Sequence, residues 1–506
     1  MRSNSVANPG DVAETPAVQS ELSRSDDNHA DGKSGGRVWV VRAVLCSFVG
    51  GSLIWMFATS SKEQVGLAAL LLMMSLLFLN LPVAIVLAAS GIVGLIALRP
   101  RAAETMLSTG AYEPIAQWTL SVLPMFILMG LLLWRSGITN QIYVTARHWL
   151  SWLPGGLAVS TNLAGAGLAA VSGSTIATTY TLGRMGIPEM LKAGYDRRLA
   201  TGSVMVAGLP GQLIPPSTFL VVYAGIAQVP VGPQLLAGIG PGLFVALAFT
   251  IVIVAIAIVA PKFVGRERGS KAKVESSAWS DRWQSLLAVW PLPVLIFIVI
   301  GGMLSGFVTA TEAASAGAAG ALLLTIWKLR GRAFSEIKKA AIETVSSVGG
   351  IFFLVVGAIT ITRLLTLCGL TQGFTDWVAS SGMGRIEFLL LILVVYLFLG
   401  TFLEPLPMML LTVPMLIPAL NSLDISLLWF GVFTVFMSEL AVLTPPVGIL
   451  AFIVYGITQD KNVSLGQHIT LKDIFVALAW VMPFAVLVAV GLIFFPEIAT
   501  YIPDRL

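Results

Sequence analysis

The chain has 506 residues, of which 56% are hydrophobic and only 11% are charged. A soluble domain carries about 25% charged residues, so this composition excludes a globular soluble protein. The two cysteines and three histidines are too few and too scattered for a disulfide framework or a metal site. The net charge of +4 is small, and in a membrane protein it indicates topology rather than binding to nucleic acid.

The first 36 residues differ from the rest, because they are rich in Ser, Asn, Asp and Gly and nearly lack large apolar side chains. This pattern predicts a disordered cytoplasmic tail over 1–36. Arg37 and Arg42 then flank an apolar run that we interpret as an extra N-terminal transmembrane helix over 37–63. The remaining residues, 64–506, form one predicted membrane-embedded unit.

Apolar runs near the roughly 20 residues that cross a bilayer recur from residue 38 to the end of the chain. Lysine and arginine collect in cytoplasmic loops, and this rule places the N-terminus inside the cell. The sequence then predicts eleven crossings, at 38–60, 65–79, 83–98, 119–135, 196–228, 235–260, 284–304, 313–327, 343–363, 425–458 and 473–495.

Two apolar segments, 156–189 and 387–420, do not fit as crossings. A single crossing by either segment would move the basic loops after it to the other side of the membrane. Each segment has a helix-breaking tip, at 172–175 in the first and at 402–407 in the second. We therefore predict two re-entrant helical hairpins, each of which enters and leaves by one face.

The same parts recur in both halves of the chain, in the order span, amphipathic stretch, hairpin and span with a double proline. Ser172 precedes Pro215 by 43 positions, and Phe402 precedes Pro445 by 43 positions. Chance similarity between apolar helix pairs is the alternative, but the predicted hairpins open from opposite faces, as in many secondary transporters. We predict an all-α polytopic membrane protein with an inverted repeat, two re-entrant hairpins and two interrupted helices, its first repeat at about 119–260 and its second at about 343–495.

Each double proline, Pro215-Pro216 and Pro445-Pro446, interrupts a predicted span. Proline lacks an N–H, so it frees the carbonyl four residues earlier, and a free carbonyl at membrane depth favours a polar cavity or a cation. The broken ends also favour a cation on one side and an anion on the other. The predicted free carbonyls are those of Gly211, Gln212, Ala441 and Val442. The hydroxyls that could join them as Na⁺ ligands are those of Ser172, Ser174, Thr175 and Thr444.

Each feature has a simpler interpretation. A double proline in a membrane helix also marks a plain kink, and Gly173 and Gly208 also suit close helix packing. Glu404 at the second tip is either functional or reaches interfacial water. Glu312 and Glu439 either cap a helix, pair with a basic residue or join the site. Interfacial anchoring is the favoured role for Trp149, Trp152, Trp279 and Trp283.

The sequence has no Gly-x-x-x-x-Gly-Lys-Ser/Thr loop and no Ser/His/Asp constellation. An ion gradient is therefore the expected energy source, and we expect neither an ATP-driven pump nor an enzyme. A transporter of this kind needs no cofactor beyond Na⁺ as the coupling ion.

Several motifs in a fixed order resemble the large membrane (permease) subunit of the tripartite ATP-independent periplasmic (TRAP) transporters. They cover about residues 64–503, and as a set they are highly specific. They begin with the Ser-Gly-Ser-Thr-Ile-Ala-Thr run from Ser172. The others include Ala193-Gly194-Tyr195-Asp196, Leu213-Ile214-Pro215-Pro216-Ser217, Leu236-Ala237-Gly238-Ile239, Thr311-Glu312-Ala313-Ala314 and Leu443-Thr444-Pro445-Pro446-Val447-Gly448.

The resemblance implies sodium-coupled import of an organic acid (a carboxylate) across the bacterial inner membrane. It implies two partners, a small four-helix TRAP membrane subunit and a periplasmic substrate-binding protein. It also implies a fold similar to divalent-anion/sodium symporters, with elevator-type alternating access. The implied sodium-binding residues are Ser172, Gly173, Ser174, Gly208, Pro210, Gly211, Phe402, Leu403, Glu404, Thr444, Pro445 and Gly448. The implied substrate-binding residues, between the two tips, are Ser174, Thr175, Pro215, Pro216, Ser217, Pro405 and Pro446.

The chain departs from the family pattern in three places. Gly208-Leu209-Pro210-Gly211 stands where the family has Gly-Thr-Leu-Gly, so one threonine hydroxyl is missing from the first sodium site. Glu404 replaces an aspartate, and Thr309-Ala310-Thr311-Glu312 replaces Thr-Pro-Thr-Glu. Two rival functions stay open. One is a stand-alone sodium/carboxylate symporter without a binding protein, and the other is a non-transporting membrane scaffold or channel.

Overall fold

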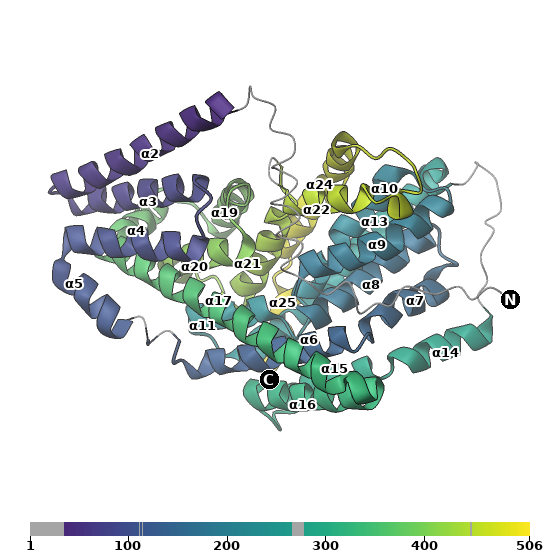
Figure 1. The fold of residues 1–506 in the computed structure, drawn as a ribbon. Coiled ribbons are helices and arrows are strands. Elements are labelled where there is room, and N and C mark those ends of the chain that lie inside the picture. Colours follow the sequence, from purple (N-terminus) through teal and green to yellow (C-terminus); the bar gives the residue numbers. More distant parts are fainter. Residues whose placement is uncertain (1–34, 111, 114, 266–277, 446–447, 506) are drawn as a thin grey trace.

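The computed structural model describes residues 35–505 except 111, 114, 266–277 and 446–447. Within these ranges the chain forms helices joined by short turns, and no strand occurs (Figure 1). This outcome follows from the solvent, because a helix satisfies all its backbone polar groups within one segment of lipid-embedded chain. Most of the predicted tail, together with Pro446, lies outside the described residues.

Four helices, α2 to α5, precede the repeated parts. The helix predicted over 37–63 is α2, which spans Gly35–Ala58 and packs along α3. Gly91 in α4 lies so close to the backbone of α17 that a Cβ atom there would be 2.8 Å from the Ile361 nitrogen. Small residues of this kind let membrane helices approach closely. The bounds are Lys62–Phe78 for α3, Val83–Leu98 for α4 and Pro100–Thr105 for α5.

The first half continues with a span, an amphipathic helix, a helical hairpin and an interrupted helix, in the predicted order. A 3-10 turn, η4, lies inside the interrupted helix. The bounds are Val122–Arg135 (α6), Thr139–Leu150 (α7), Gly156–Ser172 (α8), Thr175–Lys192 (α9), Arg197–Ala207 (α10), Leu209–Gln212 (η4), Thr218–Ala227 (α11), Val231–Ala237 (α12) and Ile239–Val259 (α13).

The second half repeats that order after three connecting helices, α14 to α16, and a 3-10 turn. Its bounds are Trp279–Val289 (α14), Pro291–Leu304 (α15), Ala310–Leu329 (α16), Ala333–Leu367 (α17), Leu370–Ser380 (α18), Arg385–Leu399 (α19), Pro405–Ser422 (α20), Leu427–Ala441 (α21), Ile449–Thr458 (α22), Lys461–Ser464 (α23), Leu471–Phe494 (α24) and Glu497–Thr500 (α25).

Cross-contacts show that α8–α9 and α19–α20 are hairpins. A Cβ atom at Gly186 would lie 3.1 Å from Thr161 Oγ1, and these two positions are equally far from the break at 173–174. In the second pair the hydroxyls of Tyr396 and Thr412 lie 2.5 Å apart, each eight positions from Glu404. Contacts that are symmetric about the break require the two arms to run antiparallel.

The structure adjusts the predicted crossings. In the described residues, six helical stretches are long and apolar enough to cross a membrane, or seven when one bent pair is included. The predicted crossing 284–304 is that pair, α14 and α15, which bends by 49°. Helix α17 has 35 residues, about 52 Å, and extends well beyond the predicted 343–363. Helices α3 and α4, with 17 and 16 residues, are short for a bilayer core.

Figure 1 shows how the described helices are grouped. In Figure 1, α2, α3 and α4 lie together at one side, α8, α9 and α10 lie at the other, and α20 and α21 lie between them. Arg135 at the end of α6 is bound by Glu336 (3.1 Å) and Glu343 (2.7 Å) of α17. This ion pair network ties the spans that begin the two repeats.

Candidate functional site

The first hairpin tip consists of residues 172–175. Gly173 has a φ of +63°, in the left-handed region that glycine adopts without steric cost, and it ends α8. The Ser174 hydroxyl accepts a hydrogen bond from the Ala177 N–H at 3.1 Å and so caps α9. The Ser172 hydroxyl has only long contacts, including 3.3 Å to Thr178 Oγ1. This hydroxyl is therefore the least committed polar group of the first tip.

The first tip packs directly on the first interrupted helix. A Cβ atom at Gly208 would lie 2.7 Å from Thr175 Cγ2, and one at Gly211 would lie 2.5 Å from the Ala166 carbonyl oxygen. Gly173 faces Thr218 at the start of α11, since a Cβ there would be 3.5 Å from its Oγ1. Gly208 therefore packs closely against Thr175, and the predicted residues of the first site lie on elements that contact one another.

The prediction that Gln212 has a free carbonyl is wrong. The backbone carbonyl oxygen of Gln212 accepts a hydrogen bond from the Ser217 hydroxyl. The same hydroxyl caps α11 by accepting from the Leu220 N–H at 3.3 Å. Residues Leu209–Gln212 form a 3-10 turn, in which the Gly211 N–H donates to the Gly208 carbonyl. A tighter turn and a serine side chain replace much of the bonding that the prolines remove. Pro210, Pro215, Pro216 and Ser217 are buried here.

Glycines at the junction of α12 and α13 cover this break. The Cα of Gly238 lies against the Leu213 carbonyl, and a Cβ at Gly242 would lie 3.2 Å from the Pro210 carbonyl. The motif around Leu236–Gly242 therefore has a packing function, because larger residues would push α13 away from the break.

The second interrupted helix breaks between α21 and α22, and here too the predicted free carbonyls have partners. The Ala441 carbonyl accepts from the Thr444 N–H at 3.0 Å, and the Val442 carbonyl accepts from the Leu450 N–H at 3.4 Å. The Thr444 hydroxyl donates to the Leu440 carbonyl at 3.0 Å. The prediction of unpaired Ala441 and Val442 carbonyls is therefore wrong, because the chain turns back on itself at Gly448, whose φ is +43°.

The second tip approaches the end of α21. A Cβ atom at Gly400 would lie 2.7 Å from the Ala441 Cα, so the last turn of α19 touches the last turn of α21. Leu403 is buried, and Pro405 is the first residue of α20. The Phe402 ring packs edge-on against the Phe78 ring of α3, with 5.5 Å between the ring centroids. This contact is with α3 and not with the broken helix. Glu404 precedes α20 and is exposed, so its side chain does not point into the packed contact.

Glu439 links the first tip to the second interrupted helix, and it is absent from the predicted site residues. The Thr175 hydroxyl donates to Glu439 Oε2 at 2.5 Å, and the two side chains are 4% and 1% exposed. Glu439 precedes Ala441, the contact of the second hairpin, by only two positions. Both hairpins thus converge on the last turn of α21. An acidic residue in an apolar span is the sequence signal that marks Glu439 as a candidate. Its partner Thr175 is 264 positions away, so the sequence does not indicate the pairing.

Glu312 and Trp149 make contacts unrelated to the two tips. Glu312 forms a capping box with Thr309, whose N–H donates to Glu312 Oε2 at 2.7 Å, so the capping interpretation is confirmed. Trp149 donates from Nε1 to the Arg282 carbonyl at 3.2 Å and lies in ring contact with Trp279 and Trp283.

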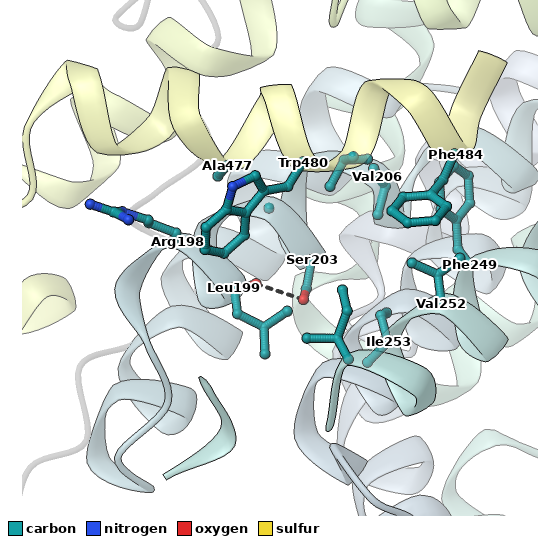
Figure 2. A pocket seen from close by; sticks show the side chains of 13 residues that line it. Arg198, Leu199, Ser203, Val206, Phe249, Val252, Ile253, Ala477, Trp480 and Phe484 are labelled. Carbon is teal, nitrogen blue, oxygen red and sulfur yellow. Dashed lines mark hydrogen bonds between the residues drawn. The ribbon is translucent and has the colours of Figure 1, made fainter. Parts of the chain in front are cut away.

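A separate pocket lies between α10, α13 and α24 (Figure 2). Its walls are mostly apolar, with Phe249, Trp480 and Phe484 among them, and Arg198 stands at one end. The Ser203 hydroxyl that points into it already donates to the Leu199 carbonyl at 2.7 Å. None of the predicted site residues that the structure describes lines this pocket, so it is distinct from the site at the tips.

Comparisons with known proteins agree with this architecture. The family model described as "Tripartite ATP-independent periplasmic transporter, DctM component" matches residues 70–498. The C4-dicarboxylate TRAP transporter large permease protein DctM of Pseudomonas aeruginosa is 32% identical over 78% of this chain and 86% of its own length. The sialic acid TRAP transporter large permease protein SiaM of Vibrio cholerae is 30% identical over 73% of this chain and 85% of its own.

A solved structure supports the fold alone. The YdaH transporter of Alcanivorax borkumensis, whose crystal structure shows an unusual topology, aligns with a TM-score of 0.52 at 17% identity. The alignment covers 84% of this chain and 97% of that one. The matched relatives are transport permeases rather than enzymes. This chain is a multi-pass protein of the bacterial inner membrane, and it belongs to the DctM component family of the tripartite ATP-independent periplasmic transporters.

Proposed function

We propose that this protein imports a small organic acid together with Na⁺, by an elevator-type movement of its two hairpins and two interrupted helices. The observation that carries the proposal is the convergence of both hairpins on the last turn of α21, through Glu439 and Ala441. Hydroxyls, helix ends and backbone at two adjacent breaks are the groups that secondary transporters use for a cation beside an anionic substrate.

The proposed sodium ligands are the groups of the two tips and breaks. At the first site they are Ser172, Gly173 and Ser174 with Gly208, Pro210 and Gly211. At the second they are Phe402, Leu403 and Glu404 with Thr444, Pro445 and Gly448. The substrate contacts Ser174, Thr175, Pro215, Pro216, Ser217, Pro405 and Pro446 between the tips. The carbonyls of Gln212, Ala441 and Val442 already accept hydrogen bonds, and they are not among these proposed ligands.

The proposed partners are a small four-helix membrane subunit and a periplasmic substrate-binding protein that delivers the acid. Family membership supports this, since the family is one component of a tripartite system. The substrate itself is proposed only as a small organic acid, with a carboxylate as the favoured class. Relatives of 27–32% identity are named for C4-dicarboxylates, sialic acid and ectoine, which carry carboxylates, and for isethionate, which is a sulfonate.

The test is uptake of labelled organic acids into proteoliposomes that contain this chain and its small subunit. Four conditions combine an inward Na⁺ gradient, present or absent, with the binding protein, present or absent. The proposal predicts uptake only when both are present. Uptake that needs Na⁺ but no binding protein would favour the stand-alone symporter, and uptake indifferent to Na⁺ would overturn the sodium proposal.

Two substitutions refine this test. Thr444→Ala and Ser174→Ala should each raise the Na⁺ concentration needed for half-maximal uptake, because each removes an oxygen from a proposed sodium site. Thr366→Ala is the matched control, since the Thr366 hydroxyl makes the same kind of bond, to the carbonyl four residues earlier, on α17 away from the tips. An equal effect in the control would assign the change to helix distortion.

A further inference from the structure

Glu439 is a buried carboxylate that has no positive partner among the described residues. Its side chain is 1% exposed in a helix that the surrounding protein encloses. In the described parts of the chain, the ion pairs involve Arg135, Arg147, Arg184, Arg197, Arg198 and Lys339, and none includes Glu439. An ionised carboxylate in such a place is very unfavourable unless a positive charge or several donors compensate it.

The surroundings of Glu439 favour a cation. The carboxylate lies in the last turn of α21, where the helix dipole contributes further negative potential. The turn η4, which packs against α21, carries Gln212, whose side chain is 1% exposed. Among the residues that the structure describes, neither the Oε1 nor the Nε2 atom of Gln212 has a hydrogen-bond partner. A buried amide with no partner is costly, so this position indicates a ligand that the chain alone does not supply.

Thr175 joins Glu439 to the first tip through two different contacts. Its hydroxyl donates to Glu439, and its methyl group packs against Gly208 of the first interrupted helix. Thr175 is itself part of the tip and follows Ser174 directly, so Glu439 is bonded to the tip without an intermediate residue. A single side chain thus connects both repeats.

From these contacts we propose that Glu439 supplies the negative charge that balances the coupling cation at the first tip, and that the Thr175 hydroxyl holds it there. The inference rests on the proposed function and adds to it a positioning residue in the second repeat. It implies that occupation of the first sodium site depends on the position of α21, the helix that both hairpins touch. Sodium binding at one tip and the arrangement of the other repeat are therefore coupled.

The test is sodium-dependent thermal stabilisation of the purified full-length chain, because binding to the folded state raises the unfolding temperature. NaCl is varied against choline chloride at constant ionic strength. In Glu439→Gln, the sodium concentration for half-maximal stabilisation should rise about tenfold or more. Glu439→Asp keeps the charge, so its sodium concentration for half-maximal stabilisation should lie between that of Glu439→Gln and that of the unaltered protein. Thr434→Val, a shape-conserving change at a buried position of the same helix, should leave the midpoint within twofold.

The hydroxyl link has its own test. Thr175→Val keeps the methyl contact with Gly208 but removes the donor to Glu439, whereas Thr175→Ser keeps the donor. Thr175→Val should raise the sodium concentration for half-maximal stabilisation, and Thr175→Ser should raise it less. In the double variant Thr175→Val/Glu439→Gln, the combined change should be smaller than the product of the single changes, because both remove the same interaction.

The outcomes separate this inference from the proposed function. If the unaltered protein shows sodium-dependent stabilisation and Glu439→Gln keeps the same midpoint, the inference fails while sodium coupling stands. If Glu439→Gln alters only the pH dependence of uptake, Glu439 carries a proton instead, and the inference also fails. If the unaltered protein shows neither sodium-dependent stabilisation nor sodium-dependent uptake, the proposed function falls and this inference falls with it.

Discussion

At the scale of single residues, the approach of the first tip to the first interrupted helix depends on the absence of a side chain at Gly208. A Cβ atom there would lie 2.7 Å from Thr175 Cγ2 and 3.2 Å from its Cα. Thr175 cannot move aside freely, because its hydroxyl is bound to the buried Glu439. Geometry at Gly208 therefore controls the distance between the tip and the break.

Gly208→Ala should separate the tip from the break and destabilise the protein by about 1–3 kcal/mol, the usual cost of overpacking a tight contact. The measurement is thermal unfolding in detergent. Gly373→Ala is the control, because a Cβ atom at Gly373 in α18 would meet nothing within 4 Å. That substitution should be neutral or slightly stabilising, since alanine is the better helix former. Equal stability of Gly208→Ala and Gly373→Ala would contradict the tight contact.

At the scale of elements, each hairpin holds its arms together by contacts placed symmetrically about its tip. The clearest is the hydroxyl pair Tyr396 and Thr412, which is buried between α19 and α20. Hydrogen bonds between membrane helices are worth about 0.6 kcal/mol on average and up to about 1.7 kcal/mol.

A double-mutant cycle with Tyr396→Phe and Thr412→Val measures this bond. Each single variant should lower the free energy of unfolding, and the coupling energy between them should be about 0.5–1.7 kcal/mol. Unfolding in a denaturing detergent supplies the free energies. A coupling energy near zero would mean that the two hydroxyls do not hold the arms together.

The elements were predictable where glycine and proline interrupt apolar sequence, because those residues locally forbid a continuous helix. The tips at Gly173 and Glu404 and the breaks near Pro215 and Pro445 lie where the sequence places them. The hydrogen bonding inside the breaks was not predictable. Ser217 turns back to the Gln212 carbonyl, and that depends on a loop conformation rather than on residue type. The pairing of Thr175 with Glu439 needs the packing of two distant repeats, which no local pattern encodes.

At the scale of the whole molecule, ion pairs between charged segments support the predicted threading. Segments assigned to the cytoplasm by their lysines and arginines lie against one another. Arg147 pairs with Glu189 at 2.7 Å, and Arg197 pairs with Asp473 at 3.1 Å. Charged segments that share one face of a membrane can meet in this way, whereas segments on opposite faces cannot. The same face therefore carries the base of the first hairpin and the loop before α24.

The central claim, that Na⁺ and the organic acid enter together, is tested most directly by following Na⁺ itself. Proteoliposomes containing this chain and its small subunit are placed in equal Na⁺ on both sides, with radioactive sodium outside. Binding protein loaded with its organic acid is then added. Because coupling works in both directions, the account predicts that sodium enters only when loaded binding protein is present, and that Thr444→Ala reduces this entry. Entry of the acid without any entry of sodium would contradict the account.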